Sequence, residues 1–311
     1  MATQEEVEFK TADGVILRGR IYAAKERGPG VVMSPGFNAV KELAGVPATA
    51  AAFQSAGITA LVYDPRTVGL SDGEPRNDIN PFREIDDLSD AFTFLSSHAS
   101  VDLQQGVGLW GMSLGGATAM CAAALDPRIR FVVAVAPATE YTHNAAKLSS
   151  VLAKAAKDRE SRVKGNEPFY VPMLNAKGEN PAGFNLGMDR EAGMRLLGMQ
   201  DENDSLRAAL APGHFNRTTV GTYRNLLLWE PRHMWKYLGK TPVMFLVPEN
   251  DHLIGRDAQL RHFELLPGPK RLHIQSGVGH MDILDGPTSQ PSVHQLQVEF
   301  VHDALAGRVA K

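Results

Sequence analysis

The chain has 311 residues, one cysteine and a formal charge of −3 from 32 basic and 35 acidic side chains. This balance argues against the strongly positive surface that binds nucleic acid or an anionic membrane. A single cysteine cannot form an internal disulfide or a cysteine metal cluster, and the first residues lack the basic and apolar regions of a secretion signal. We therefore expect a cytoplasmic protein with no metal, cofactor, nucleic-acid partner or membrane partner. Its oligomeric state is open, with a homodimer as one alternative.

The first predicted elements are two strands, Val7–Lys10 and Val15–Tyr22, joined by a turn into an antiparallel hairpin. Six apolar runs rich in β-branched residues follow, which is typical of strands buried on both faces of a parallel sheet. Helices are predicted between them at Lys41–Ala56 and Pro81–Ser97, so the fold class is α/β with helices on both sides of the sheet. The six strands are Gly30–Pro35, Ile58–Asp64, Gly106–Trp110, Phe131–Pro137, Pro242–Pro248 and Arg271–Gln275.

A long segment without a strong strand pattern interrupts this alternation. It covers residues 139–238, begins with polar helical sequence and has a middle rich in proline, glycine and asparagine. A stretch of roughly 100 residues is too long for a loop in a compact domain. We therefore predict a mostly helical cap at 139–238, inserted after the sixth strand of a core formed by residues 1–138 and 239–311.

A serine flanked by glycines lies where the strand Gly106–Trp110 gives way to a helical sequence. Gly111 and Gly115 stand two positions before and after Ser113, the spacing of a nucleophile elbow, in which the turn leaves no room for larger side chains. This turn places a serine hydroxyl at a helix N-terminus, where backbone N–H groups can stabilise a developing oxyanion. The pattern therefore predicts that Ser113 is a nucleophile.

A serine nucleophile needs a histidine as its base and a carboxylate that orients the histidine. In folds with this elbow the acid and then the histidine follow the serine along the chain. His280 follows the last predicted strand and Asp251 follows the strand before it, so we assign them as general base and as orienting acid. Glu249 is closer to the strand end and is the alternative acid. The backbone N–H groups of Phe37 and Leu114 are the predicted oxyanion hole.

With these residues in order, the chain resembles the α/β-hydrolase superfamily over nearly its whole length. The resemblance is carried by SPGF, YDPRTVGLSDGEPRN, GMSLGG, PENDHL and GVGHMDIL. The run PGFNAVKE, followed by YDPRTVGLSDGEPRNDINP, is similar to α/β hydrolases of fungal polyketide gene clusters, including the polyketide transferase group. The resemblance implies an α/β-hydrolase fold and a role in secondary metabolism.

Together the site and the resemblance point to hydrolysis of an ester or thioester through an acyl-enzyme on Ser113. The alternatives are acyl transfer to an alcohol or amine, and C–C hydrolysis or cyclisation by the same residues. The substrate is expected to be a small acyl compound, free or attached to coenzyme A or to a carrier protein. A non-catalytic receptor is disfavoured because all three triad residues are present.

Six further residues are candidates for contact with the substrate because they lie near the predicted strand ends or the start of the cap. For Arg66 the alternative is a structural role, in which its side chain binds and fixes backbone groups. For Trp110 the alternative is a place in the apolar core. Tyr141 and His143 have an alternative as solvated linker. The six candidates are Asn38, Arg66, Trp110, Met112, Tyr141 and His143.

Overall fold

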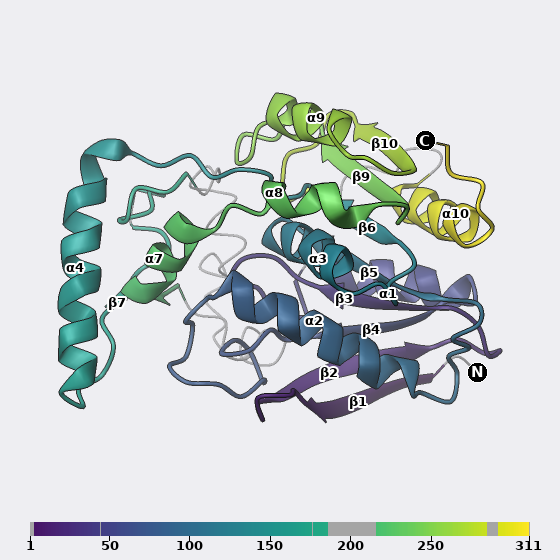
Figure 1. Ribbon diagram of the computed structural model, residues 1–311, viewed down its shortest axis with the longest axis horizontal. Helices are drawn as coiled ribbons and strands as arrows, with labels where there is room; N and C mark the ends of the chain where they lie inside the picture. Colours follow the sequence, from purple (N-terminus) through teal and green to yellow (C-terminus); the bar gives the residue numbers. More distant parts are fainter. Residues whose placement is uncertain (1–2, 44, 176, 186–215, 285–291, 311) are drawn as a thin grey trace.

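The computed structural model describes residues 3–43, 45–175, 177–185, 216–284 and 292–310, and within them lies an eight-stranded sheet (Figure 1). The strand order is β1-β2-β4-β3-β5-β6-β9-β10. β2 pairs antiparallel with both β1 and β4, whereas every neighbouring pair from β4 to β10 is parallel. The predicted α/β-hydrolase fold is thereby confirmed. The strands are β1 (Thr3–Lys10), β2 (Ile16–Ala23), β3 (Gly30–Ser34), β4 (Thr59–Tyr63), β5 (Val107–Met112), β6 (Val132–Val135), β9 (Val243–Pro248) and β10 (Lys270–Gln275).

Helices cover both faces of this sheet. In Figure 1, α2 (Pro81–Ser96) and α3 (Leu114–Leu125) lie in front of the strands, and α1 (Val46–Ser55) lies behind them. Successive strand residues point to opposite faces, so Leu109 joins the apolar cluster beneath α2 and α3 while Trp110 joins the cluster on the other face. α9 (Arg256–Glu264) contributes to the first cluster and α10 (Val293–Leu305) to the second. The sheet is therefore buried between two helical layers.

The structure confirms the predicted start of one helix and shifts the start of the other. α2 begins at Pro81 as predicted, and the Asn80 side chain caps it by accepting a hydrogen bond of 3.1 Å from the Phe82 N–H. α1 begins at Val46 instead of Lys41. Gly45, with φ of +82°, turns the chain immediately before the helix, and residues 36–43 form a loop that reaches the site described below.

Between β6 and β9 the chain forms α4 (Ala145–Val163), two short paired strands, α7 (Val220–Leu228), α8 (Arg232–Trp235) and a 3-10 helix, η1 (Lys236–Leu238). The strands are β7 (Tyr170–Val171) and β8 (Thr218–Thr219). α4 and α7 pack together beyond one end of the sheet (Figure 1). They share a small apolar cluster formed by Val151, Met173, Leu174, Ala182, Phe184, Tyr223 and Leu226.

The predicted cap extends beyond α4 and α7. Residues 186–215 lie outside the described residues. α8 and η1 pack against α3, and Trp235 and Leu238 belong to the apolar cluster of the sheet. Within the described parts of the chain, no helix has both the length and the apolar character needed to cross a membrane.

Candidate active site

Ser113 occupies the sharp turn between β5 and α3, with φ of +56°. The turn requires glycine at both predicted positions. A Cβ on Gly111 would lie 2.1 Å from the carbonyl oxygen of Gly115, and a Cβ on Gly115 would lie 2.4 Å from that of Pro35. A non-glycine residue with positive φ is uncommon and strained. The Ser113 N–H donates to Val135 O at 2.8 Å, which fixes the strained residue to the neighbouring strand.

His280 and Asp251 meet at the same end of the sheet. His280 Nδ1 lies 2.8 Å from Asp251 Oδ2, and the two residues are only 6% and 5% exposed. The other carboxylate oxygen, Oδ1, accepts hydrogen bonds from the N–H groups of Leu253 and Ile254, at 2.9 and 3.1 Å. The carboxylate is therefore held from both sides and directs one oxygen at the imidazole.

The surroundings of Asp251 keep it ionised. Burial raises the pKa of this carboxyl, but the charge and hydrogen bond of His280 and the N–H groups of Ile254 and Leu253 outweigh burial and hold the pKa below its ordinary value. Gln259, fully buried in α9, donates a further hydrogen bond of 2.8 Å from Nε2 to Asp251 Oδ2. An anionic acceptor at this place keeps the proton of the neutral imidazole on Nδ1, which leaves Nε2 free to act as a base.

Glu249, the alternative acid, has a different partner. Its Oε2 accepts a hydrogen bond of 2.9 Å from the Gly277 N–H, which joins the loop after β9 to the loop after β10. His280 therefore pairs with Asp251, whereas Glu249 binds the backbone of the loop that carries the histidine.

The loop that follows β3 lies against the elbow. A Cβ placed on Gly36 would lie 3.2 Å from the Cβ of Ser113 and 3.9 Å from its Oγ, so the peptide between Gly36 and Phe37 adjoins the Ser113 side chain. Leu114 is the first residue of α3, where an N–H has no helical carbonyl to bind. Both N–H groups predicted for the oxyanion hole, those of Phe37 and Leu114, therefore belong to segments next to the Ser113 side chain.

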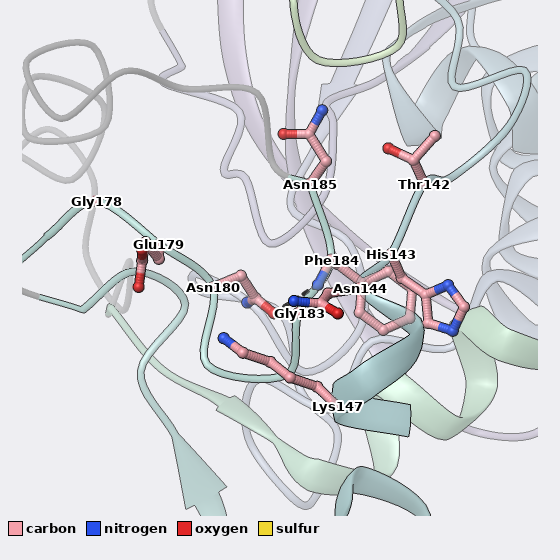
Figure 2. Close-up of a pocket in the computed structure, with 10 residues that line it drawn as sticks. All are labelled: Thr142, His143, Asn144, Lys147, Gly178, Glu179, Asn180, Gly183, Phe184 and Asn185. Atoms are coloured by element: carbon pink, nitrogen blue, oxygen red, sulfur yellow. Dashed lines mark hydrogen bonds between the residues drawn. The ribbon is translucent and has the colours of Figure 1, made fainter. Parts of the chain in front are cut away.

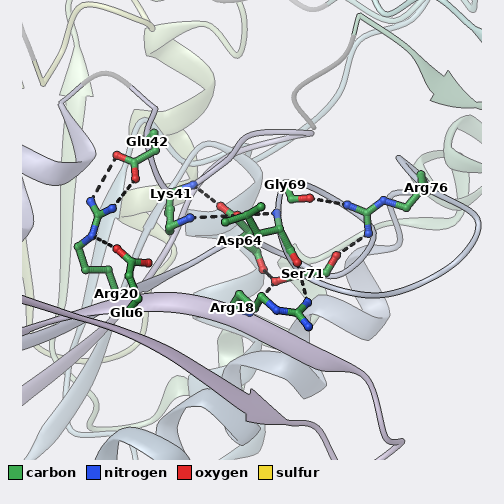
Figure 3. A network of polar contacts seen from close by, with 10 residues as sticks. Glu6, Arg18, Arg20, Lys41, Glu42, Asp64, Gly69, Ser71 and Arg76 are labelled. Atoms are coloured by element: carbon green, nitrogen blue, oxygen red, sulfur yellow. Dashed lines mark hydrogen bonds and ion pairs between the residues drawn. The ribbon is translucent and has the colours of Figure 1, made fainter. Parts of the chain in front are cut away.

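A buried ion pair fastens this loop to the end of β4 (Figure 3). The carboxylate of Asp64 accepts hydrogen bonds from the Lys41 N–H at 2.7 Å and from the Leu70 N–H at 2.8 Å. Lys41 Nζ lies 3.3 Å from Asp64 Oδ2, and both side chains are almost inaccessible to solvent. Since Lys41 is five residues beyond Gly36, the pair restrains the loop that places the Phe37 peptide beside Ser113.

Ser113 and His280 share one pocket, which is mainly apolar. Two of the predicted substrate residues, Met112 and Tyr141, line it. Met173 enters it from the segment that follows β7, and Leu253 enters it from the loop between β9 and α9. The remaining lining residues are Gly36, Phe37, Ala39, Leu43 and Met281. An apolar pocket around a nucleophile suits an acyl chain and limits the access of water.

Three other predicted substrate residues are engaged in structural contacts. The Asn38 side chain is 2% exposed, and its Oδ1 accepts a hydrogen bond of 2.9 Å from Asn77 Nδ2. Arg66 binds the carboxylates of Asp87 and Asp13, with Nε at 2.7 Å from Asp87 Oδ2. Trp110 is fully buried, and its indole N–H donates to Gln297 Oε1 at 2.6 Å on the other face of the sheet. For Arg66 and Trp110 these contacts favour the structural alternatives.

The last candidate, His143, lines a separate hollow (Figure 2). Its ring packs against Phe184, with the ring centres 5.8 Å apart. Among the residues that the structure describes, its Nε2 is buried and has no hydrogen-bond partner.

Two supporting contacts were missed by the sequence reasoning, those of Gln259 and of the Lys41–Asp64 pair. Gln259 is eight residues after Asp251, at the start of α9, and a polar residue on the buried face of that helix was the only local signal. Lys41 and Asp64 are 23 residues apart, and no short motif links them. Within the described ranges, no group of three or more His, Cys, Asp or Glu side chains could hold a metal ion.

Comparison with known proteins gives consistent results. Residues 30–286 match the family model described as serine aminopeptidase, S33. The chain is 44% identical over 286 residues to a thiohydrolase of Eupenicillium brefeldianum, covering 92% of this chain and 90% of the relative. It is 40% identical over 305 residues to a polyketide transferase of Stachybotrys chlorohalonatus, covering 97% and 98%.

The solved structure of DcsB in complex with its substrate analogue superposes with a TM-score of 0.88 at 39% identity, covering 98% of this chain and 100% of the other. The resemblance to hydrolases of fungal polyketide clusters, inferred above from short motifs, is thus confirmed at the level of whole chains. The chain belongs to the serine aminopeptidase S33 family of α/β hydrolases.

Proposed function

We propose that this protein is a serine-dependent thioester hydrolase or acyl transferase that works through an acyl-enzyme on Ser113. The observation that carries the proposal is the buried Asp251–His280 pair, with Nδ1 and Oδ2 2.8 Å apart, whose histidine shares a pocket with the elbow serine. Relatives named thiohydrolase and polyketide transferase support a thioester as the acyl donor. An oxygen ester reacts by the same steps.

In the first half-reaction, Ser113 Oγ attacks the acyl carbonyl while His280 Nε2 takes the hydroxyl proton. Asp251 stabilises the imidazolium that results. The backbone N–H groups of Phe37 and Leu114 bind the negatively charged oxygen of the tetrahedral intermediate. As the intermediate collapses, the carbon–sulfur bond breaks, the thiol takes the proton from His280, and the acyl group stays on Ser113.

In the second half-reaction, His280 removes a proton from the acceptor, which then attacks the acyl-enzyme. The bond between the acyl carbon and Ser113 Oγ then breaks, and the serine oxygen takes the proton from His280. Water gives hydrolysis, and an alcohol or amine gives transfer. The apolar lining of the pocket favours an acceptor that is itself partly apolar over bulk water, and one relative is named a polyketide transferase. Transfer is therefore the second candidate function, and C–C hydrolysis or cyclisation by the same residues is a further alternative.

We also propose that residues 139–238 form a cap on the site, since α4 and α7 have their own apolar cluster and Met173 reaches the pocket. The cytoplasmic location stays a prediction of the sequence.

The test is release of thiol from short- and medium-chain acyl N-acetylcysteamine thioesters by wild type and by Ser113→Ala. We expect the substitution to reduce turnover by at least about a thousandfold. Adding alcohols should divert the acyl group to an ester product if transfer is the natural reaction. Thiol release that Ser113→Ala leaves unchanged would refute the proposed mechanism.

A further inference from the structure

A second hollow, of about 450 Å³, has a more polar lining than the pocket that holds Ser113 and His280. Figure 2 shows the residues of this hollow. Polar side chains from the start of α4 and from the loop at 178–185 line most of it. Its lining residues are Thr142, His143, Asn144, Lys147, Gly178, Glu179, Asn180, Gly183, Phe184 and Asn185.

The hollow and the active-site pocket share a wall. Tyr141 lines the pocket, and the next two residues line the hollow. The ring of Phe184 packs edge-on against Tyr141, with the ring centres 6.3 Å apart. Asn185 Nδ2 donates to the carbonyl oxygen of Leu253 at 3.3 Å, and Leu253 lines the pocket. The two cavities are therefore neighbours, and a ligand long enough to extend past this wall could have its apolar end beside Ser113 and its polar end in the hollow.

Lys147 supplies an ammonium group to the hollow. Its side chain extends across the hollow towards Asn180 (Figure 2), and within the described part of the chain no carboxylate pairs with its ammonium group. Its stem lies over Gly183, where a Cβ would come 3.0 Å from Lys147 Cδ and where φ is +84°. A glycine at this position lets the lysine lie flat across the loop. The acidic lining residue, Glu179, is exposed and accepts a hydrogen bond of 3.3 Å from Asn175.

The other polar groups of the hollow include both donors and acceptors. The Asn144 side chain uses its oxygen to accept a hydrogen bond of 3.0 Å from the Ala146 N–H, which leaves its NH₂ group as a donor. Thr142 is exposed and contributes a hydroxyl, which can donate and accept. Such a lining, with the ammonium group of Lys147 extended across it and the carboxylate of Glu179 exposed and bound to Asn175, fits a chain of amides that ends in an anion.

We propose that this hollow binds the phosphate-bearing arm of the thioester donor, with the Lys147 ammonium group on the phosphate and the acyl end beside Ser113. The proposal rests on the thioester chemistry proposed above. The phosphorylated pantetheine arm has this composition, since it joins a thiol through two amides to a phosphate. Coenzyme A and acyl carrier domains both present this arm, and lysine binds phosphate as a compact charge.

The experiment compares Lys147→Met with wild type on three donors that carry the same acyl group: the pantetheine thioester without phosphate, the pantetheine 4′-phosphate thioester and the coenzyme A thioester. Lys154→Met is the matched control, because Lys154 is exposed on the same helix seven residues further on. Lys147→Arg keeps the charge. All four proteins are full-length chains, and their melting temperatures are measured in parallel.

We expect Lys147→Met to lower kcat/KM about tenfold on both phosphorylated donors, mainly through KM, and to leave the phosphate-free donor unchanged. Lys147→Arg should retain most of the activity, and Lys154→Met should match wild type on every donor. Equal effects of Lys147→Met on donors with and without phosphate would overturn the inference, as would no effect on any donor. An effect on coenzyme A alone would assign Lys147 to the nucleotide phosphates and would also refute the binding of the arm.

The same assay separates this inference from the proposed function. Turnover of the phosphate-free donor that depends on Ser113 shows that the proposed function stands, whatever Lys147→Met does. If Ser113→Ala does not reduce turnover of any donor, the proposed function itself fails.

Discussion

Asp251→Asn is expected to remove nearly all activity while leaving the fold intact. In wild type, Asp251 Oδ1 accepts the N–H groups of Leu253 and Ile254, and Oδ2 accepts from His280 and Gln259. An asparagine can keep its oxygen on the two backbone N–H groups and then turns its NH₂ group towards His280 and Gln259. The two side chains that would face this new donor must both become acceptors.

Each of them can do so. Gln259 Oε1 is buried and has no hydrogen-bond partner within the described residues, so rotation of this amide presents an acceptor to the asparagine. His280 can accept on Nδ1 only if its proton moves to Nε2. That tautomer cannot take the proton from Ser113. We therefore expect the free energy of unfolding to fall by only about 1 kcal/mol and kcat/KM to fall about 10⁴-fold, which corresponds to about 5.4 kcal/mol of transition-state stabilisation.

The assay is kcat/KM on an acyl thioester at pH 8, together with urea unfolding of the same samples. Glu249→Gln is the matched control, since a glutamine oxygen can still accept the Gly277 N–H that Glu249 binds at 2.9 Å. It should stay within about twofold of wild type. A loss of less than tenfold in Asp251→Asn, or a larger loss in Glu249→Gln, would refute the assignment of the orienting acid.

Three predictions concern the framework around the site. Gly115→Ala should lower the free energy of unfolding by about 3 kcal/mol, because its Cβ would lie 2.4 Å from the carbonyl oxygen of Pro35; an unchanged urea midpoint would contradict this. Lys41→Met should cost about 3 kcal/mol in the same measurement by leaving Asp64 buried with one partner fewer, and wild-type stability would show that the ion pair is dispensable. Burial, with a smaller contribution from the charge of Asp87, raises the pKa of Glu84 to about 8 from 4.5, so the folded state retains a proton that the unfolded state loses. Stability should therefore fall as the pH rises from 4.5 to 8. The melting temperature of Glu84→Gln should decline less than that of wild type over this range, and an equal decline in the two proteins would contradict the role of Glu84.

The strands and the elbow could be predicted because they depend on residues close together in the sequence. Gly111 and Gly115 flank Ser113 at fixed spacing, and the neighbouring β-branched runs identify the strands. Chain order and strand ends were also enough to bring His280 near two candidate acids. The sequence favoured Asp251 but left Glu249 open, because the choice depends on how the loop after β9 turns one carboxylate to the histidine and the other to Gly277.

The substrate candidates were harder to judge because their partners are distant in the sequence. Arg66 binds an aspartate 21 residues away, Asn38 binds an asparagine 39 residues away, and Trp110 binds a glutamine 187 residues away. Each candidate lies near a strand end, where a polar or aromatic residue suggests a binding role. Only the three-dimensional structure shows that these side chains already have partners. Met112 and Tyr141, by contrast, line the pocket.

The most direct test of the account is intact-mass spectrometry of the enzyme, quenched in acid within the first turnovers on an acyl thioester. The account predicts a mass increase equal to one acyl group in wild type, located on the peptide that contains Ser113, and no increase in Ser113→Ala. Undiminished turnover by Ser113→Ala, without an adduct on either protein, would contradict the acyl-enzyme and with it the central role of the elbow serine.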